Sequence, residues 1–275
     1  MKITRLLVLF STLVLGCTSD PQRHADEIAQ VAGLQRETLP VSPFVLTTYV
    51  RITRTDRPLN IYIEGDGRAW RTRNLPADDP TPRRALGLSL AAADRAANVV
   101  YIARPCQFTP SSVNPACQPD YWTDKRFAPE VITAMDRAIT HYAAKVPTQS
   151  IVLTGYSGGG AVAVLVAARR QDIALLRTVA GNLDHDAVNQ LHGVSLMPGS
   201  LNPRDVAKQV AAIPQWHFSG EDDRIVPPFV AEHFARAVGE CAQVRRIPGI
   251  GHEGDWASLW PSLINLRTPC RRSNL

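Results

Sequence analysis

The chain has 275 residues, of which 45% are hydrophobic and 20% are charged. This length and composition suit one large buried core or two small ones, and they exclude a disordered, collagen-like or multi-span membrane protein. The formal net charge of +5 is small and scattered, without the basic stripe and interleaved aromatics of a nucleic-acid-binding protein, so we expect no nucleic-acid partner. The 5 cysteines cannot all pair within one chain, so one thiol needs a separate role.

The N-terminal segment has the features of an export signal. Lys2 and Arg5 precede an apolar run that is too short to span a bilayer as a mature helix. Residues 13–17, Leu-Val-Leu-Gly-Cys, resemble the cleavage box of bacterial lipoproteins. The resemblance implies that residues 1–16 are a removed signal peptide and that Cys17 becomes an acylated N-terminus.

An acylated cysteine implies a location for the protein. Several acyl chains of the palmitate kind anchor a protein stably in a membrane, whereas one chain binds only marginally. Thr18 follows the cysteine, where an aspartate would suggest retention in the inner membrane. We therefore expect a lipid-anchored protein of the bacterial cell envelope, facing the periplasm from the outer membrane or lying on the cell surface, with residues 17–43 as a tether. The alternative is an ordinary signal peptide with a cysteine there by chance.

In an exported chain the other four cysteines can form disulfides, and four cysteines allow three pairings. Cys106 and Cys117 lie in one irregular, proline-rich stretch, so we favour a bridge between them, which is worth roughly 3 kcal/mol on the chain-entropy model. Cys241 and Cys270 would then pair and hold the C-terminal segment. This second bridge would enclose the segment that carries His252, and we hypothesise that it keeps that residue in register.

The rest of the chain alternates between strand and helix patterns. An apolar run or period-two alternation predicts each strand, and apolar residues near helical spacing predict each helix. Such alternation predicts an α/β protein with a mostly parallel central sheet and helices on both faces. Residues 181–213 are less regular and are expected to form a small cap over one sheet edge. Strands are expected at 44–50, 59–63, 98–103, 150–154, 176–180, 215–219 and 243–247, and helices at 84–97, 128–144, 158–171 and 228–238.

The sharpest motif is Gly-Tyr-Ser-Gly-Gly at residues 155–159. It follows the apolar strand 150–154 and opens a helix rich in small residues, which is the setting of a nucleophile elbow. In that turn the hydroxyl of Ser157 is lifted above the sheet, and the flanking glycines let helix and strand approach closely. The bland alternative is a glycine-rich turn, but it lacks the lysine of a P-loop and the spacing of a dinucleotide fingerprint.

A serine hydroxyl needs a base to take its proton, and the base needs a carboxylate to orient it. His252 follows the last expected strand in a turn of Pro-Gly-Ile-Gly and is the favoured base. Asp223 follows the strand 215–219 and is the favoured acid, with Asp222 as a close competitor and Asp184 as a second alternative. The weaker candidates for the base are His185, His192, His217 and His233.

Acyl transfer also needs N–H groups aimed at the developing oxyanion, each worth about 3 kcal/mol. One candidate is the amide of Gly158, next to the nucleophile. The other is the amide of Asp66, in the turn Glu-Gly-Asp-Gly at residues 64–67 that follows an early strand. The alternative for this second turn is a simple glycine turn without a chemical role.

In chain order, Ser157, Asp223 and His252 resemble the nucleophile–acid–histidine order of the α/β-hydrolase superfamily. The resemblance covers roughly residues 44–265 and implies an α/β-hydrolase domain over residues 44–275. It also implies that the serine is the nucleophile, the histidine the base and acid, and the aspartate its orienting partner. The combination with the lipoprotein signal looks like a lipoprotein branch of that superfamily. A departure is Glu64, which stands where many members have histidine.

The expected function is cleavage of a carboxylic ester, from a small molecule or a lipid, through an acyl-enzyme at an envelope membrane. The alternatives are an amidase, peptidase or acyltransferase on the same fold, or a non-catalytic envelope lipoprotein with a vestigial triad. We expect no cofactor and no metal, because the cysteines lack C-x-x-C spacing and the histidines are dispersed.

Ligands of such sheets bind beyond the carboxyl ends of the strands. The loop from Cys106 to Cys117 leaves the strand 98–103 at that edge and is expected to form one wall of the site. Four aromatic residues are candidates either for lining the site or for anchoring loops in the core: Trp70, Tyr121, Trp122 and Trp256.

Overall fold

The computed structural model describes residues 20–147, 149–268 and 270. The expected signal peptide and Cys17 lie outside the described residues. The strands run over Gln35–Val41 (β1), Phe44–Ile52 (β2), Leu59–Ile63 (β3), Trp70–Thr72 (β4), Leu75–Pro76 (β5), Asn98–Ile102 (β6), Ile151–Tyr156 (β7), Ile173–Val179 (β8), Gln215–Gly220 (β9) and Ala242–Ile247 (β10). The α-helices run over Pro21–Val31 (α1), Leu86–Ala93 (α2), Pro129–Ala143 (α3), Gly158–Ala167 (α4), His185–His192 (α5), Pro228–Val238 (α6) and Trp256–Leu263 (α7), with 3₁₀ turns at Pro119–Trp122 (η1) and Pro203–Val210 (η2).

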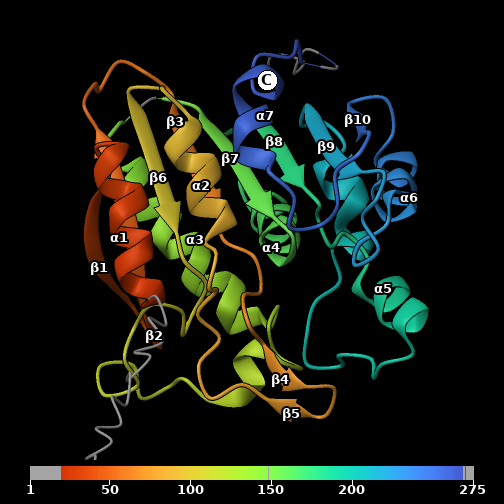
Figure 1. Ribbon diagram of the computed structural model, residues 1–275. Helices are drawn as coiled ribbons and strands as arrows, with labels where there is room; N and C mark the ends of the chain where they lie inside the picture. Colours follow the sequence, from red (N-terminus) through yellow and green to blue (C-terminus); the bar gives the residue numbers. More distant parts are fainter. Residues whose placement is uncertain (1–19, 148, 269, 271–275) are drawn as a thin grey trace, which may run out of the picture.

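The centre of the molecule is an 8-stranded sheet in the order β1-β2-β6-β3-β7-β8-β9-β10 (Figure 1). The neighbours from β6 to β10 pair in parallel, while β2 pairs antiparallel with both β6 and β1. The expected α/β class with a mostly parallel sheet is therefore confirmed. Because the parallel strands all run the same way, the loops after β3, β7, β9 and β10 leave the sheet at one edge.

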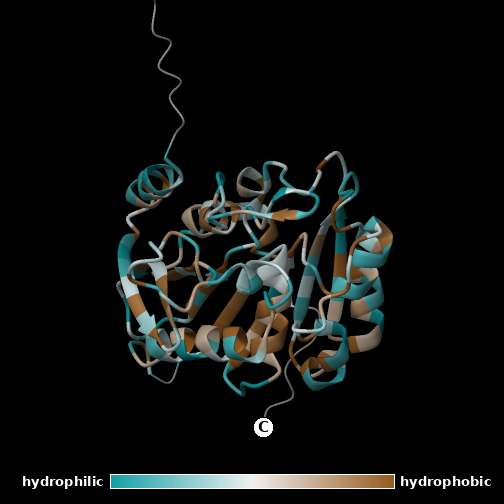
Figure 2. Ribbon diagram, turned by 90° about the horizontal axis from the view of Figure 1, so that it is seen from below, coloured by the Kyte–Doolittle hydropathy of each residue, from teal (hydrophilic) through white to brown (hydrophobic). Residues whose placement is uncertain are grey.

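Helices cover both faces of the sheet, as expected (Figure 2). The side chains of α3, α4 and α6 share one buried cluster with one face of the strands. The side chains of α1, α2 and α7 share a second cluster with the other face. Helix α4 is buried all round, which matches its run of alanine, valine and glycine without a polar stripe. No helix within the described residues is long and apolar enough to cross a membrane.

The expected tether over residues 17–43 is wrong for its described part. Helix α1 packs through Ala25 and Ala29, which are both buried. Strand β1 pairs with β2 over its full length and buries Leu39 and Val41. Neither element has a strong hydrophobic pattern in the sequence, since only one side of each needs to be apolar. The buried stripe of α1 consists of alanines, and most residues of the edge strand β1 are polar. Helix α1 and strand β1 therefore belong to the folded domain.

Other elements differ in extent or were not expected. Helix α2 is shorter than the expected helix 84–97, since its last turn ends at Ala93. The irregular segment 181–213 carries α5 and η2, and η2 packs against α4 and α6. The hairpin β4–β5 and the C-terminal helix α7 were not expected. In the ribbon view β4–β5 and α5 lie beyond the carboxyl edge of the parallel strands (Figure 1).

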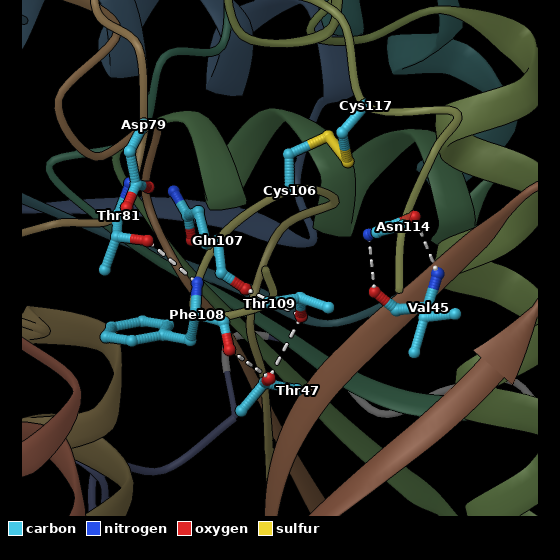
Figure 3. The surroundings of a disulfide bond; sticks show 10 residues. All are labelled: Val45, Thr47, Asp79, Thr81, Cys106, Gln107, Phe108, Thr109, Asn114 and Cys117. Carbon is cyan, nitrogen blue, oxygen red and sulfur yellow. Dashed lines mark hydrogen bonds between the residues drawn. A yellow bond between two sulfur atoms is a disulfide. The ribbon is translucent and has the colours of Figure 1, made fainter. Parts of the chain in front are cut away.

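Both favoured disulfides are present. Cys106 is joined to Cys117, and Cys241 is joined to Cys270. The first bridge closes a loop that is bound to β2 by side-chain contacts (Figure 3). The side chain of Asn114 pairs with both backbone groups of Val45. The second bridge links the start of β10 to the segment that follows α7.

Candidate active site

The serine of the Gly-Tyr-Ser-Gly-Gly motif lies in the sharp turn between β7 and α4. Ser157 has φ 51° and ψ −120°, a positive φ that is unfavourable for any residue with a Cβ. The flanking glycines are required by space: a Cβ on Gly155 would lie 2.1 Å from the carbonyl oxygen of Gly159. A Cβ on Gly159 would lie 2.4 Å from the carbonyl oxygen of Ile63, at the end of β3. The turn can therefore form only with glycine at both positions.

Three side chains from three strand ends form one hydrogen-bonded chain. Ser157 Oγ lies 2.9 Å from Nε2 of His252. Nδ1 of the same ring lies 2.8 Å from Oδ2 of Asp223. This geometry suits the tautomer in which Nδ1 carries the proton and Nε2 is free to accept the serine proton. The three residues favoured from the sequence are thus brought together, from the ends of β7, β9 and β10.

The acid and histidine loops meet because their backbones are tied together. A Cβ on Gly220 would lie 2.2 Å from the carbonyl oxygen of Ile250, so only glycine permits this approach. That carbonyl accepts the N–H of Asp222 at 3.1 Å. Asp223 then turns inward, and its Oδ1 accepts the N–H groups of Ile225 at 2.9 Å and Val226 at 2.8 Å. These two backbone N–H groups therefore hold the carboxylate in place independently of its hydrogen bond with the imidazole.

The competing acids have other positions. Asp222 is exposed. Asp184 caps α5 by accepting the N–H of Ala187 at 3.2 Å and pairs with Arg204 at 3.0 Å. Neither acid forms a hydrogen bond or ion pair with His252 among the described residues.

The other histidines are structural or peripheral. His217 is fully buried inside β9, and burial lowers its pKa to about 3. His185 is buried against Phe127, and burial lowers its pKa as well. His192 and His233 are not among the residues that line the cavity at Ser157.

Two aromatic side chains fix the backbone of the histidine. The carbonyl oxygen of His252 accepts the hydroxyl of Tyr156 at 3.1 Å and the indole N–H of Trp256 at 3.0 Å. Trp256 is fully buried, so it anchors the loop and does not line the site. This hydrogen bond from Tyr156 was not expected from the sequence. The one feature of the sequence that could have indicated it is the position of Tyr156 next to the nucleophile.

The turn after β3 lies directly against the nucleophile. A Cβ on Gly65 would lie 3.2 Å from the Cβ of Ser157. The amide N–H groups of Asp66 and Gly158 form no hydrogen bond with any residue in the described part of the chain. Two unpaired donors beside one serine hydroxyl are what stabilisation of an oxyanion requires.

Glu64 holds this turn from behind. Its buried carboxylate accepts four hydrogen bonds, from the amides of Gly65, Gly87 and Leu88 and from the hydroxyl of Tyr101. Burial raises the pKa of this carboxyl, and the hydrogen bonds counteract part of the effect. Glu64 therefore connects the turn to the first turn of α2, where N–H groups are free to donate. In the sequence this glutamate is visible only as a departure from the superfamily pattern, with no indication of this role.

The carboxylate of Asp66 bridges two arginines under the same turn. It accepts from Arg104 at 3.0 Å and from Arg126 at 2.9 Å. The side chains of Asp66 and Arg104 are only 17% and 5% exposed. Burial alone would raise the pKa of Asp66, but the two guanidiniums outweigh it and hold that pKa below its ordinary value. No local sequence pattern predicts this cluster, because its members are distant along the chain.

We expect Asp66→Asn to destabilise the fold by about 3–5 kcal/mol at neutral pH, because it leaves two buried guanidiniums without a counter-charge. A carboxyl with a lowered folded-state pKa stabilises above its unfolded pKa of about 3.9, and this contribution is lost as pH falls through the folded-state value. Urea unfolding at pH 7, 5, 4 and 3 should therefore show a gap between wild type and variant that is full at neutral pH and shrinks below pH 4.

The matched control is Asp56→Asn, which removes the carboxylate of an exposed pair with Arg54. We expect no measurable change in unfolding free energy for this control. An Asp66→Asn variant as stable as the control at pH 7 would contradict the structural role of the buried cluster.

The loop closed by Cys106 and Cys117 is not a wall of the site, contrary to expectation. None of its residues lines the cavity at Ser157. The loop instead supports segments next to the cavity. Gln107 donates to the carbonyl of Gly65 at 2.9 Å, and the amide of Phe108 donates to the Thr81 hydroxyl at 2.8 Å (Figure 3).

The two aromatics that follow this loop anchor it in the core. Trp122 is buried and donates to the carbonyl of Ala77 at 3.0 Å. Tyr121 packs edge-on against Phe44 with ring centroids 4.8 Å apart. Neither side chain lines the cavity.

The serine opens into a cavity of about 590 Å³. Ser157 and His252 lie in its wall, and Trp70 of β4 and Ile225 line it with exposed side chains. Within the described ranges no group of three or more His, Cys, Asp or Glu side chains could hold a metal ion. The further lining residues are Glu64, Asp66, Gly67, Arg68, Ala69, Pro82, Arg83, Arg84, Leu86, Arg126, Tyr156 and Glu253.

Comparisons with known proteins show the fold. No protein-family model and no curated protein matches the sequence. A candidate lipase from Acinetobacter baumannii is similar in structure, with a TM-score of 0.63 and 15% identity over 89% of this chain and 94% of that chain. Est1E from Butyrivibrio proteoclasticus has a TM-score of 0.57 and 14% identity over 83% and 97% of the two chains. An alpha-beta serine hydrolase homologue from Coxiella burnetii has a TM-score of 0.56 and 14% identity over 83% and 92%. The chain has the α/β-hydrolase fold, as expected.

Proposed function

We propose that this protein is a serine hydrolase that cleaves a carboxylic ester through an acyl-enzyme. The observation that carries the proposal is the hydrogen-bonded chain from Ser157 through His252 to Asp223, with both bonds below 3 Å. In the proposed reaction His252 takes the serine proton as Oγ attacks the ester carbonyl, and then gives it to the leaving alcohol. Water, activated by the same imidazole, releases the acid.

The amides of Asp66 and Gly158 are the proposed oxyanion donors. The two residues touch where the turn after β3 packs on the elbow: a Cβ at Gly158 would lie only 2.0 Å from Oδ1 of Asp66. The paired arginines keep the Asp66 carboxylate neutralised, so that its charge does not oppose the oxyanion. Each donor would contribute about 3 kcal/mol to the transition state.

The proposal includes an anchor in an envelope membrane through acylated Cys17. Helix α1 begins at Pro21, a few residues after this cysteine, so the anchor would hold the folded body close to the lipid surface. The test is incorporation of labelled palmitate in a bacterial host: label on the wild type and none on Cys17→Ala supports the anchor. Equal labelling, or none on either chain, contradicts it.

The test of the reaction compares p-nitrophenyl esters with the matching p-nitroanilides of acetate, butyrate and octanoate. We expect turnover of the esters with an initial burst of nitrophenol, since an acyl-enzyme releases the alcohol first. Faster cleavage of the anilides would favour an amidase or peptidase, and acyl transfer to an added alcohol in preference to water would favour a transferase. No turnover of any substrate would favour the non-catalytic alternative.

A further inference from the structure

The cavity at the candidate nucleophile carries an excess of arginine. Four arginines line it, Arg68, Arg83, Arg84 and Arg126. Arg126 is used internally, because it pairs with Asp66. The side chains of the other three form no hydrogen bond or ion pair with any described residue, and all three residues are exposed.

The three unpaired arginines come from two loops that are tied to one another. The amide of Arg68 donates to the carbonyl of Pro80 at 2.9 Å. A Cβ on Gly67 would lie 2.1 Å from that same carbonyl oxygen, so the loops touch through backbone. Arg83 and Arg84 follow within the second loop, just before α2. The contact between the two loops therefore fixes the backbone that carries the three arginines, whereas their side chains have no hydrogen-bond or ion-pair partner among the described residues.

Among the described residues, none of the acids that line the cavity forms a hydrogen bond or ion pair with these three arginines. The carboxylate of Glu64 is saturated by four donors, and that of Asp66 is shared by Arg104 and Arg126. Glu253 is the remaining acid in the lining. A second depression beside the cavity is also lined by Arg68 and Arg83, so these two arginines face both hollows. Arg71 lines it too, but its guanidinium pairs with Asp78 of the same depression at 3.2 Å.

We propose that Arg68, Arg83 and Arg84 bind an oxyanion, a phosphate or a carboxylate, that the ester substrate itself carries. This inference rests on the proposed hydrolase function and names its substrate class. Guanidinium groups match both oxyanions in planar, two-pronged hydrogen bonds. Trp70, Leu86 and Ile225 line the same cavity and suit an apolar chain. The substrate is therefore an anionic ester with an apolar part.

The test uses two matched pairs of soluble esters. One pair is p-nitrophenyl hexanoate and mono-p-nitrophenyl adipate, in which the carboxylate lies on the acyl side. The other is 1,2-dibutyrylglycerol and its 3-phosphate, in which the anion lies on the alcohol side. We expect at least one anionic ester to have a kcat/KM tenfold or more above its neutral partner, with an advantage that falls as salt is added. The pair that shows it identifies the side of the ester that carries the anion.

The triple variant Arg68→Gln, Arg83→Gln, Arg84→Gln should bring the ratio of the two kcat/KM values close to one. The matched control removes three exposed arginines outside the cavity, in the variant Arg95→Gln, Arg245→Gln, Arg267→Gln. It loses the same net charge and should keep the ratio of the wild type. Equal kcat/KM values within both pairs for the wild type would overturn the inference, and so would a ratio that both triple variants reduce equally. The neutral esters are also measured in anionic vesicles. If the triple variant lowers activity only in the vesicles, the arginines bind the lipid surface, and this result would also overturn the inference.

A binding experiment separates failure of the inference from failure of the proposed function. Hexyl phosphate should raise the Tm of the Ser157→Ala variant more than hexanol does, and adding the three cavity substitutions should remove this difference. If no ester is hydrolysed but the phosphate binds in this way, the hydrolase proposal fails while the anion site stands. If esters are hydrolysed and neither anionic ester nor hexyl phosphate is preferred, the anion site fails alone.

Discussion

Ser157→Ala is expected to lower kcat for p-nitrophenyl butyrate by about 10⁵-fold or more, because no other group replaces the nucleophile. Among the described residues, the hydroxyl forms one hydrogen bond, with Nε2 of His252 at 2.9 Å. Alanine keeps a Cβ, so the positive φ of the turn is not made worse. The variant should therefore retain the Tm and circular dichroism of the wild type.

The control for this variant is Ser112→Ala, which removes an exposed hydroxyl in the loop between the first pair of bridged cysteines. It should hydrolyse the ester at the wild-type rate. If Ser157→Ala kept a tenth or more of the wild-type kcat, another residue would be the nucleophile and the proposed mechanism would be wrong.

Asp223→Asn is expected to lower kcat by about 10³- to 10⁴-fold with little loss of stability. The amide oxygen can still accept from the backbone N–H groups of Ile225 and Val226, which now bind Oδ1. The amide NH₂ then faces Nδ1 of His252, in place of Oδ2 at 2.8 Å. An imidazole that accepts at Nδ1 carries its proton on Nε2 and cannot take the serine proton.

Two further acids give the comparison that decides the assignment. Asp222→Asn should leave kcat within about twofold of the wild type, since this exposed carboxylate does not reach the histidine. Asp184→Asn should weaken the fold, because it caps α5 and pairs with Arg204, but it should not abolish turnover. A loss of activity in Asp222→Asn as large as in Asp223→Asn would contradict the placement of the acid.

The residues at strand ends could be found from the sequence. Ser157, Asp223 and His252 each follow an apolar strand and stand among turn residues, and parallel strands bring such ends to one edge. The pairing of Cys106 with Cys117 was also predictable, because it is local and its loop contains prolines that exclude a helix. Each of these predictions depends on a pattern that lies within a few residues along the chain.

The features that the sequence did not predict depend on contacts between distant segments. Arg104 and Asp66 are 38 residues apart, and neither has a local pattern that identifies its partner. Helix α1 is predicted poorly because its buried face is made of Ala25 and Ala29, which contribute little hydrophobic signal. The loop after Cys106 leaves the sheet at the edge where the site lies, so the sequence predicts that it forms a wall of the site. In the structure it turns toward β2 and contacts the turn beside Ser157 through Gln107.

The central claim is that Ser157 is an activated nucleophile, and covalent labelling tests it most directly. The folded protein is treated with a fluorophosphonate and digested, and the peptides are weighed by mass spectrometry. We predict one phosphonyl group on Ser157 of the wild type, and none on Ser157 after unfolding in urea or in the variant His252→Gln. An unlabelled wild-type Ser157, or equal labelling of the native and unfolded protein, would contradict the account.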